Sequence, residues 1–123
     1  MQEMQSHVAK LAPLEACGLL AGNSGHVEHV IKIRNQMQSP ARFVMDPREQ
    51  LMAFDWIDSE GLELVGIFHS HPAGPETVSV TDIAEVTYDV VHIIWSRNGD
   101  VWKARGFWIE DGKAGDVTLE ITD

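Results

Sequence analysis

A buried strand that ends in two histidines constrains this chain most. Residues 62–68 are mostly apolar and predict a strand, which the sequence continues as His69-Ser70-His71. Successive side chains of a strand point to opposite faces, so His69 and His71 share one face. Two imidazoles on one side of a strand end can bind one ion. The end of this strand is therefore a candidate metal site.

A third possible metal ligand, the carboxylate of Asp82, follows the two histidines in the sequence. The loop of residues 72–78 contains proline and glycine, and the next residues, Ser79-Val80-Thr81-Asp82, predict a helix start. This start would carry Asp82 back toward the imidazoles. Two imidazole nitrogens, one carboxylate oxygen and a position left for water form the usual catalytic zinc site. Ser79 and Asp82 also suit structural roles. Ser79 can be the N-cap, and Asp82 can stabilise the helix as an acid in the first turn, where it interacts favourably with the helix dipole.

Composition limits the partners and the kind of metal site. A chain of 123 residues predicts one domain, residues 1–123. A single cysteine, Cys17, excludes an internal disulfide and a multi-cysteine metal site. The formal charge of -10 argues against nucleic acid or an anionic membrane as partner. Without a signal peptide or a long apolar run, we expect a cytoplasmic protein. The oligomeric state stays open, a homodimer included.

One helix has clear start and stop signals. Asp46 can cap it, and the proline that follows suits the first turn, where its missing N–H costs nothing. Leu51, Phe54 and Ile57 are predicted to form its core face, and Gly61 to end it.

The remaining segments predict a mixed sheet with helices packed on it. A turn at Asn98-Gly99 is expected to join two of the strands as a hairpin. The other predicted elements are helices over residues 1–12 and 79–88, and strands over residues 16–21, 27–33, 62–68, 90–95, 101–109 and 117–121.

The spacing of these residues resembles a known motif. An upstream glutamate, His-Ser-His-Pro, a seven-residue gap and Ser-x-x-Asp are similar to the JAMM (MPN+) motif of zinc metallopeptidases. Pro13–Leu20 is similar to the family's glutamate-bearing stretch, and residues 43–95 to its element order. Val80 stands where relatives often have proline, which removes no functional group. The resemblance implies an α/β MPN fold, a curved mixed sheet flanked by helices, similar to cytidine deaminases. Deaminase activity is disfavoured because the His-x-Glu and Pro-Cys-x-x-Cys pattern is absent.

The resemblance also assigns roles at the metal. His69, His71 and Asp82 would bind Zn²⁺, and Ser79 would donate a hydrogen bond to the developing oxyanion. Zinc makes a nucleophilic water available at neutral pH and polarises the scissile carbonyl.

A carboxylate that does not bind the metal must then move the proton. The resemblance implies Glu15 for this role. From the residues alone Glu15 would be an exposed loop acid, and Glu85, three positions beyond Asp82, would compete for the role. Cys17 is predicted to be a packed strand residue and not a nucleophile.

The family acts on ubiquitin-like or sulfur-carrier proteins, which are the implied substrates here. Two activities use the same site: cleavage of an isopeptide bond to lysine, and release of an amino acid from a carrier's carboxyl terminus. The carrier tail would lie extended along a sheet edge. Residues 72–78 and the segment after Arg34 are the predicted specificity surfaces. A scaffold of the same fold without metal is the alternative from another class.

Overall fold

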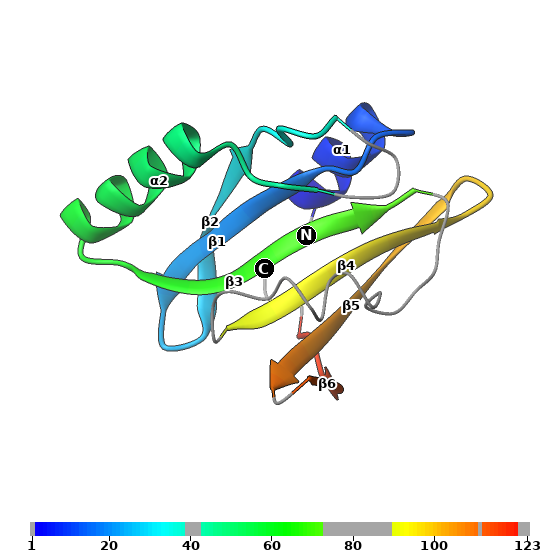
Figure 1. Cartoon of the computed structure of the whole chain (residues 1–123). Coiled ribbons are helices and arrows are strands. Elements are labelled where there is room, and N and C mark those ends of the chain that lie inside the picture. Colours follow the sequence, from blue (N-terminus) through cyan, green and yellow to red (C-terminus); the bar gives the residue numbers. More distant parts are fainter. Residues whose placement is uncertain (1, 39–42, 73–89, 111, 121–123) are drawn as a thin grey trace.

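One mixed sheet organises the structure. The computed structural model describes residues 2–38, 43–72, 90–110 and 112–120. The described strands form a six-stranded sheet in the order β2-β1-β3-β4-β5-β6 (Figure 1). Its parallel pair is β3 with β4, and the other neighbouring pairs are antiparallel. The elements are α1 (Gln2–Leu11), β1 (Cys17–Asn23), β2 (His26–Ile33), α2 (Pro47–Ser59), β3 (Glu63–His71), β4 (Val91–Asn98), β5 (Val101–Glu110) and β6 (Lys113–Val117).

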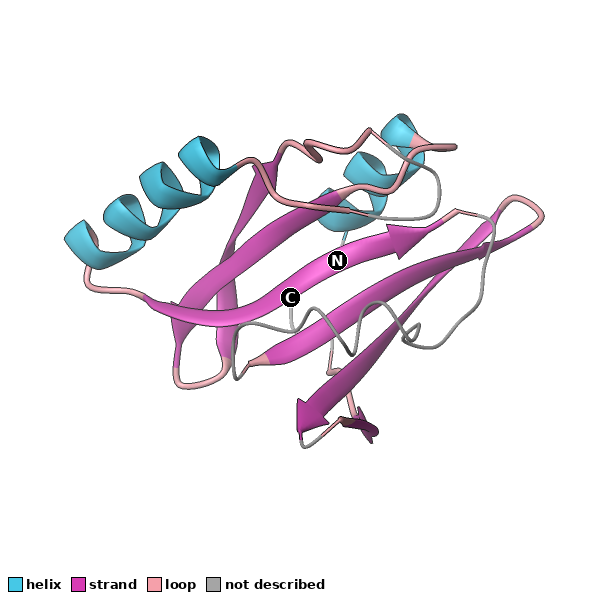
Figure 2. Cartoon of the chain, in the orientation of Figure 1, coloured by secondary structure: helices cyan, strands magenta, loops and turns pink. Residues whose placement is uncertain are grey.

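The two described helices cover opposite faces of this sheet (Figure 2). Leu19 and Leu20 are neighbours in β1, and they pack into different clusters because strand side chains alternate. The α2-side core contains Cys17, Leu19, Ala21, Ile33, Met45, Ala53, Ile57 and Ile67. The α1-side core contains Met4, Val8, Ala16, Leu20, Phe68, Ile93 and Trp95. The predicted α/β fold, a mixed sheet flanked by helices, is confirmed. Within the described part of the chain, no helix is long and apolar enough to cross a membrane.

Helix α1 agrees with the sequence pattern, since Met4 and Val8 are its buried residues. On the next face His7 is half-buried, and its ring meets the ring of Phe68 edge-on, with centroids 6.1 Å apart. Burial and the charge of Lys32 lower the pKa of His7 from its usual value of 6.5, although a backbone hydrogen bond at Cys17 opposes them. Folding therefore favours the neutral form of this imidazole.

We expect acid to destabilise the fold through His7. The pKa of His7 is lower in the folded chain, so the unfolded chain binds more protons as the pH falls through 6.5. The contribution of the neutral His7 side chain to the free energy of unfolding is therefore complete above that pH, and it is lost as the pH falls below it. Melting temperatures measured between pH 8 and pH 5 should thus fall less steeply for His7→Gln than for the wild type. A difference that does not change with pH would contradict this.

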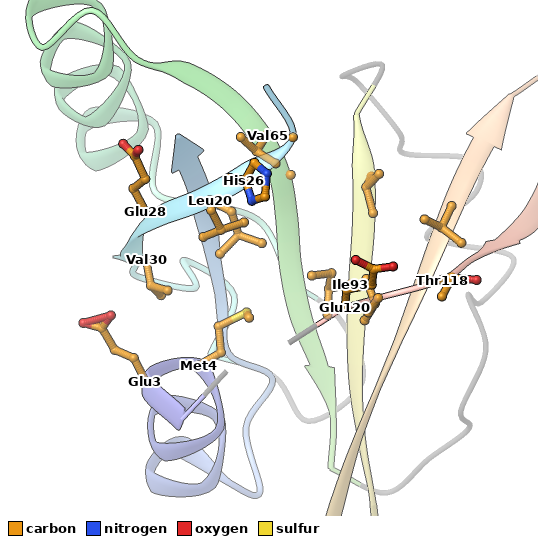
Figure 3. A pocket seen from close by; sticks show the side chains of 16 residues that line it. Glu3, Met4, Leu20, His26, Glu28, Val30, Val65, Ile93, Thr118 and Glu120 are labelled. Carbon is orange, nitrogen blue, oxygen red and sulfur yellow. The ribbon is translucent and has the colours of Figure 1, made fainter. Parts of the chain in front are cut away.

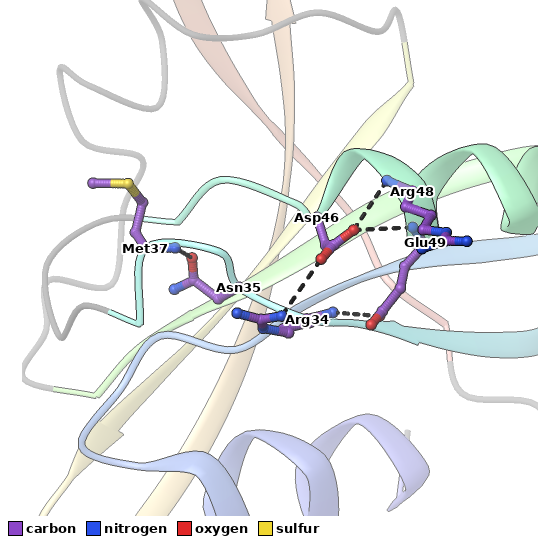
Figure 4. Close-up of polar contacts among 6 residues, drawn as sticks. All are labelled: Arg34, Asn35, Met37, Asp46, Arg48 and Glu49. Carbon is purple, nitrogen blue, oxygen red and sulfur yellow. Dashed lines mark hydrogen bonds and ion pairs between the residues drawn. The ribbon is translucent and has the colours of Figure 1, made fainter.

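Helix α2 begins as predicted, and of its predicted core face Phe54 and Ile57 pack against the core whereas Leu51 does not. The Asp46 carboxylate accepts hydrogen bonds from the backbone N–H groups of Arg48 and Glu49 (Figure 4). Ile57 is buried, but the predicted core residue Leu51 is 63% exposed. At 100° per residue, six positions turn the helix by 600°, so Leu51 and Ile57 point about 120° apart. The prediction for Leu51 was therefore wrong.

The hairpins at the carboxyl end correct two predicted boundaries. Asn98 pairs with Val101, so the turn is Gly99-Asp100 and not Asn98-Gly99. Gly99 has a φ of 64°, which glycine adopts without strain. The last strand, predicted over residues 117–121, is Lys113–Val117, because its pairing with β5 begins with Lys113 opposite Glu110. The predicted helix 79–88 lies outside the described residues.

Candidate functional site

The two histidines of β3 meet on the α2 side of the sheet. Ile67 belongs to the α2-side core, and His69 and His71 follow it at the two-residue period of a strand. Both are buried, with 1% and 4% of their surface exposed. The Nε2 atoms of the two rings lie 3.1 Å apart. The predicted shared face is confirmed.

Strand pairing brings Glu15 to the same place. Cys17 lies opposite His69 in the antiparallel β1–β3 pair, and continuing this register places Glu15 level with His71. Glu15 is 4% exposed, so the reading as an exposed loop acid was wrong. One ligand-capable atom from each of Glu15, His69 and His71 lies within 4.8 Å of the other two. Pairing between β1 and β3, which are far apart in the sequence, thus brings one carboxylate close to two imidazoles.

The donor set fits a divalent metal such as zinc. Zinc binds imidazole nitrogen at about 2.0–2.1 Å in tetrahedral geometry, which places two such nitrogens about 3.3 Å apart. The separation of the His69 and His71 Nε2 atoms, 3.1 Å, agrees with this within a few tenths of an ångström. Two buried imidazoles whose Nε2 atoms face each other, beside a buried carboxylate, form a suitable metal site.

The remaining predicted site residues cannot be compared with this cluster. Ser79 and Asp82 lie outside the described residues, as does Glu85, the competitor of Glu15. Ser79 and Asp82 stay predictions from the sequence.

Three neighbours of the cluster were not predicted. The ring of Phe43 stacks on His69, with centroids 4.4 Å apart and planes at 26°. Ser70 and Asn35 are buried polar residues. Asn35 donates to the Glu15 carbonyl, and Ser70 accepts from the N–H of Ala16. Ser70 stands inside the His-x-His pair, where its side chain points to the other face. The polar segment after Arg34 gave no local signal that Asn35 would be buried.

Cys17 is part of the core, as predicted. It is fully buried, and its Sγ donates to the Ile33 carbonyl at 3.4 Å. Burial, followed by the charges of Glu15 and Glu49, raises the pKa of the Cys17 thiol to about 12. Only the thiolate is a good nucleophile, so this thiol suits packing and not catalysis.

Cys17 should accordingly resist alkylation in the native protein. With a pKa of about 12, roughly one thiol in 10⁴ is ionised at pH 8, and burial limits access further. Ellman's reagent should find no reactive thiol in native protein and one per chain after unfolding in guanidinium. Rapid labelling without unfolding would contradict the buried position.

A separate groove lies on the opposite side of the sheet (Figure 3). It has a volume of about 480 Å³ and runs between α1, β2 and the segment after β6. Leu20 and Ile93, both from the α1-side core, form part of its floor. The groove therefore does not belong to the cluster of Glu15, His69 and His71.

Comparison with known proteins finds relatives that align over most of the chain. A desampylase of Pyrococcus furiosus is 38% identical, with 93% of this chain and 81% of the relative aligned. A probable TtuB-protein conjugate cleaving protease of Thermus thermophilus is 36% identical, with 92% and 74% aligned. The CysO-cysteine peptidase of Mycobacterium tuberculosis is 29% identical, with 98% and 85% aligned.

Solved structures and a family profile agree with these matches. A solution structure from Desulfitobacterium hafniense has a TM-score of 0.89 and 33% identity, and covers 100% of this chain and 88% of that one. A JAB1/MPN domain protein from Archaeoglobus fulgidus shares the fold, with a TM-score of 0.62, 22% identity, and 99% and 93% coverage. The profile of the prokaryotic homologs of the JAB domain matches residues 1–109. The chain therefore belongs to this prokaryotic JAB family, and is a short member of the JAMM/MPN group that its motif resembles.

Proposed function

We propose that this protein is a zinc-dependent peptidase that hydrolyses the bond after the carboxyl terminus of a ubiquitin-like or sulfur-carrier protein. The observation that carries the proposal is the buried cluster of Glu15, His69 and His71, whose ligand-capable atoms lie within 4.8 Å of one another. Relatives that align over most of their length are named as peptidases or conjugate-cleaving proteases.

Three residues would hold the metal. His69 and His71 supply the imidazole nitrogens, and Asp82 is proposed as the carboxylate ligand. When bound there, zinc would activate water for attack at neutral pH and polarise the scissile carbonyl. Phe43 stacks on His69 and so limits rotation of that ring.

Glu15 would carry the proton. Its carboxylate oxygen accepts a proton from the attacking water and delivers it to the nitrogen of the leaving amine as the carbon–nitrogen bond breaks. The products are the carrier's carboxylate and a free amine, so a single water molecule balances the reaction. Ser79 is proposed to donate a hydrogen bond to the oxyanion.

The substrate would be the flexible tail of a carrier protein. The site lies where β1 begins and β3 ends, beside the segment that follows Arg34. A tail that reached it in extended form could pair with main-chain groups, while the formal charge of -10 favours a protein partner over nucleic acid.

Relatives support two variants of this activity. The desampylase and the TtuB-conjugate protease are named for conjugates, which favours isopeptide cleavage as the main proposal. The name of the CysO-cysteine peptidase joins CysO to cysteine, which favours release of an amino acid as the second.

A substrate panel tests the proposal. Zinc-loaded protein is incubated with lysine conjugates of ubiquitin-like carriers and with carriers extended by one amino acid, and mass spectrometry identifies the products. We expect a free carrier that ends at its native carboxyl terminus, together with the released amine. Release from lysine alone supports isopeptidase activity, and removal of the extra amino acid alone supports trimming. No new product from any substrate would refute the proposal.

A further inference from the structure

Two buried side chains hold the peptide group that joins Glu15 to Ala16. The carbonyl of Glu15 accepts a hydrogen bond from Asn35 Nδ2 at 3.0 Å. The N–H of Ala16, on the other side of the same peptide bond, donates to Ser70 Oγ at 2.8 Å. Asn35 and Ser70 are 5% and 0% exposed. Since a peptide group is planar and includes the Cα atom of the preceding residue, the two bonds fix its orientation and the position of the Glu15 Cα, from which the side chain starts.

The bond to Ser70 links Glu15 to the histidines. Ser70 lies between His69 and His71 on β3, and its backbone N–H donates to the Ala16 carbonyl at 3.0 Å. In a hydrogen-bonded pair of an antiparallel ladder the two residues exchange both backbone bonds. Here the N–H of Ala16 donates to the Ser70 hydroxyl. Ser70, the residue between the two histidines, thus also holds the backbone next to Glu15.

The bond to Asn35 links the Glu15 backbone to the segment of Phe43 and Val44. Asn35 Oδ1 accepts from the N–H groups of Met37 (Figure 4) and Val44, at 3.1 and 3.0 Å. These two donors identify the oxygen of the amide, so the NH₂ group faces the Glu15 carbonyl. Val44 follows Phe43, whose ring stacks on His69. Asn35 therefore connects the backbone of Glu15 to the segment that packs against a proposed zinc ligand.

We propose that Ser70 and Asn35 are positioning residues, which align the Glu15 carboxylate with the attacking water through the Glu15–Ala16 peptide group. This inference rests on the proposed role of Glu15 in proton transfer. Misplacing a reacting group by about 1 Å can cost a factor of about 10² in rate. Loss of either bond should therefore lower kcat and leave zinc binding and KM nearly unchanged.

Variants at Ser70 test the first bond. Ser70→Ala removes the acceptor for the Ala16 N–H, and Ser70→Thr retains it. We expect kcat to fall about 10–10²-fold in Ser70→Ala and to be largely restored in Ser70→Thr, with one zinc per chain in both. Hydrogen exchange at the Ala16 amide should accelerate in Ser70→Ala alone, which reports on the bond without any activity measurement.

Variants at Asn35 separate its two functions. Asn35→Asp retains an acceptor oxygen for Met37 and Val44 but presents no NH₂ group to the Glu15 carbonyl. It should therefore lose as much kcat as Asn35→Ala, about 10–10²-fold, although it preserves the loop bonds. The control is Ile57→Val, a small core deletion in α2 near the opposite end of β3, which should lower stability without changing kcat.

The outcomes separate failure of this inference from failure of the proposed function. A wild-type protein that cleaves no carrier substrate refutes the proposed function. An active wild type with normal kcat in Ser70→Ala, despite faster exchange at Ala16, refutes the positioning role. Loss of zinc in step with loss of kcat, or full kcat in Asn35→Asp, would likewise refute it, since the residues would then act only on the metal site or the loop. Should Ser70→Ala fail to fold, the Asn35 pair decides.

Discussion

Replacing Glu15 with glutamine should lower turnover of the carrier substrate by about 10²–10⁴-fold while zinc stays bound. Glutamine has nearly the same shape, so the peptide group held by Ser70 and Asn35 can keep its position. The amide, however, cannot accept and return a proton at neutral pH. The loss should appear in kcat, because Glu15 is proposed to act on the reacting atoms and not on the carrier.

Single-turnover cleavage and zinc content, measured on the same preparation, check this prediction. Glu63→Gln is a matched control, since it removes a carboxylate at the exposed start of β3 and should leave the rate unchanged. Near-normal turnover in Glu15→Gln would move the proton-transfer role elsewhere, with Glu85 as the sequence-based competitor. Loss of zinc together with activity would instead make Glu15 a metal ligand, completing a His-His-Glu set.

Removal of the metal should have the second large effect. A chelator is expected to reduce turnover to background and to lower the melting temperature by several degrees, because a ligand that binds only the folded state stabilises it. Added zinc should reverse both changes. Zinc affinity should also fall in acid, since protons compete with the metal for the imidazoles of His69 and His71.

The matched comparison for metal removal uses histidine variants. His69→Ala should be inactive and insensitive to the chelator, whereas His26→Ala, at an exposed position of β2, should behave as the wild type. Turnover and melting temperature that do not respond to the chelator in the wild type would contradict a metal at this site.

Local signals in the sequence predicted most of the elements. Apolar spacing located α1, a cap located the start of α2, and alternation placed His69 and His71 on one face of β3. The prediction failed for Leu51 because a three-residue step does not return to the same face of a helix over two repeats. It failed for β6 because this strand already pairs with β5 from Lys113 onward, before the predicted start at Val117.

The site itself depends on contacts that no local pattern encodes. Glu15 reaches the histidines through pairing between β1 and β3, and the bond from Ala16 to Ser70 spans 54 positions of sequence. Only the family resemblance indicated Glu15 in advance. Asn35 was missed for the same reason, since its bond to the Glu15 carbonyl spans 20 positions.

The zinc content of the purified protein tests the central claim most directly. After dialysis against metal-free buffer, elemental analysis should find one zinc per chain in the wild type and close to none in a variant that lacks both His69 and His71. A folded wild type that binds no zinc when the metal is supplied, or a double variant that binds as much as the wild type, would contradict the account. The first of these results would instead identify the chain as a scaffold of the JAMM/MPN fold.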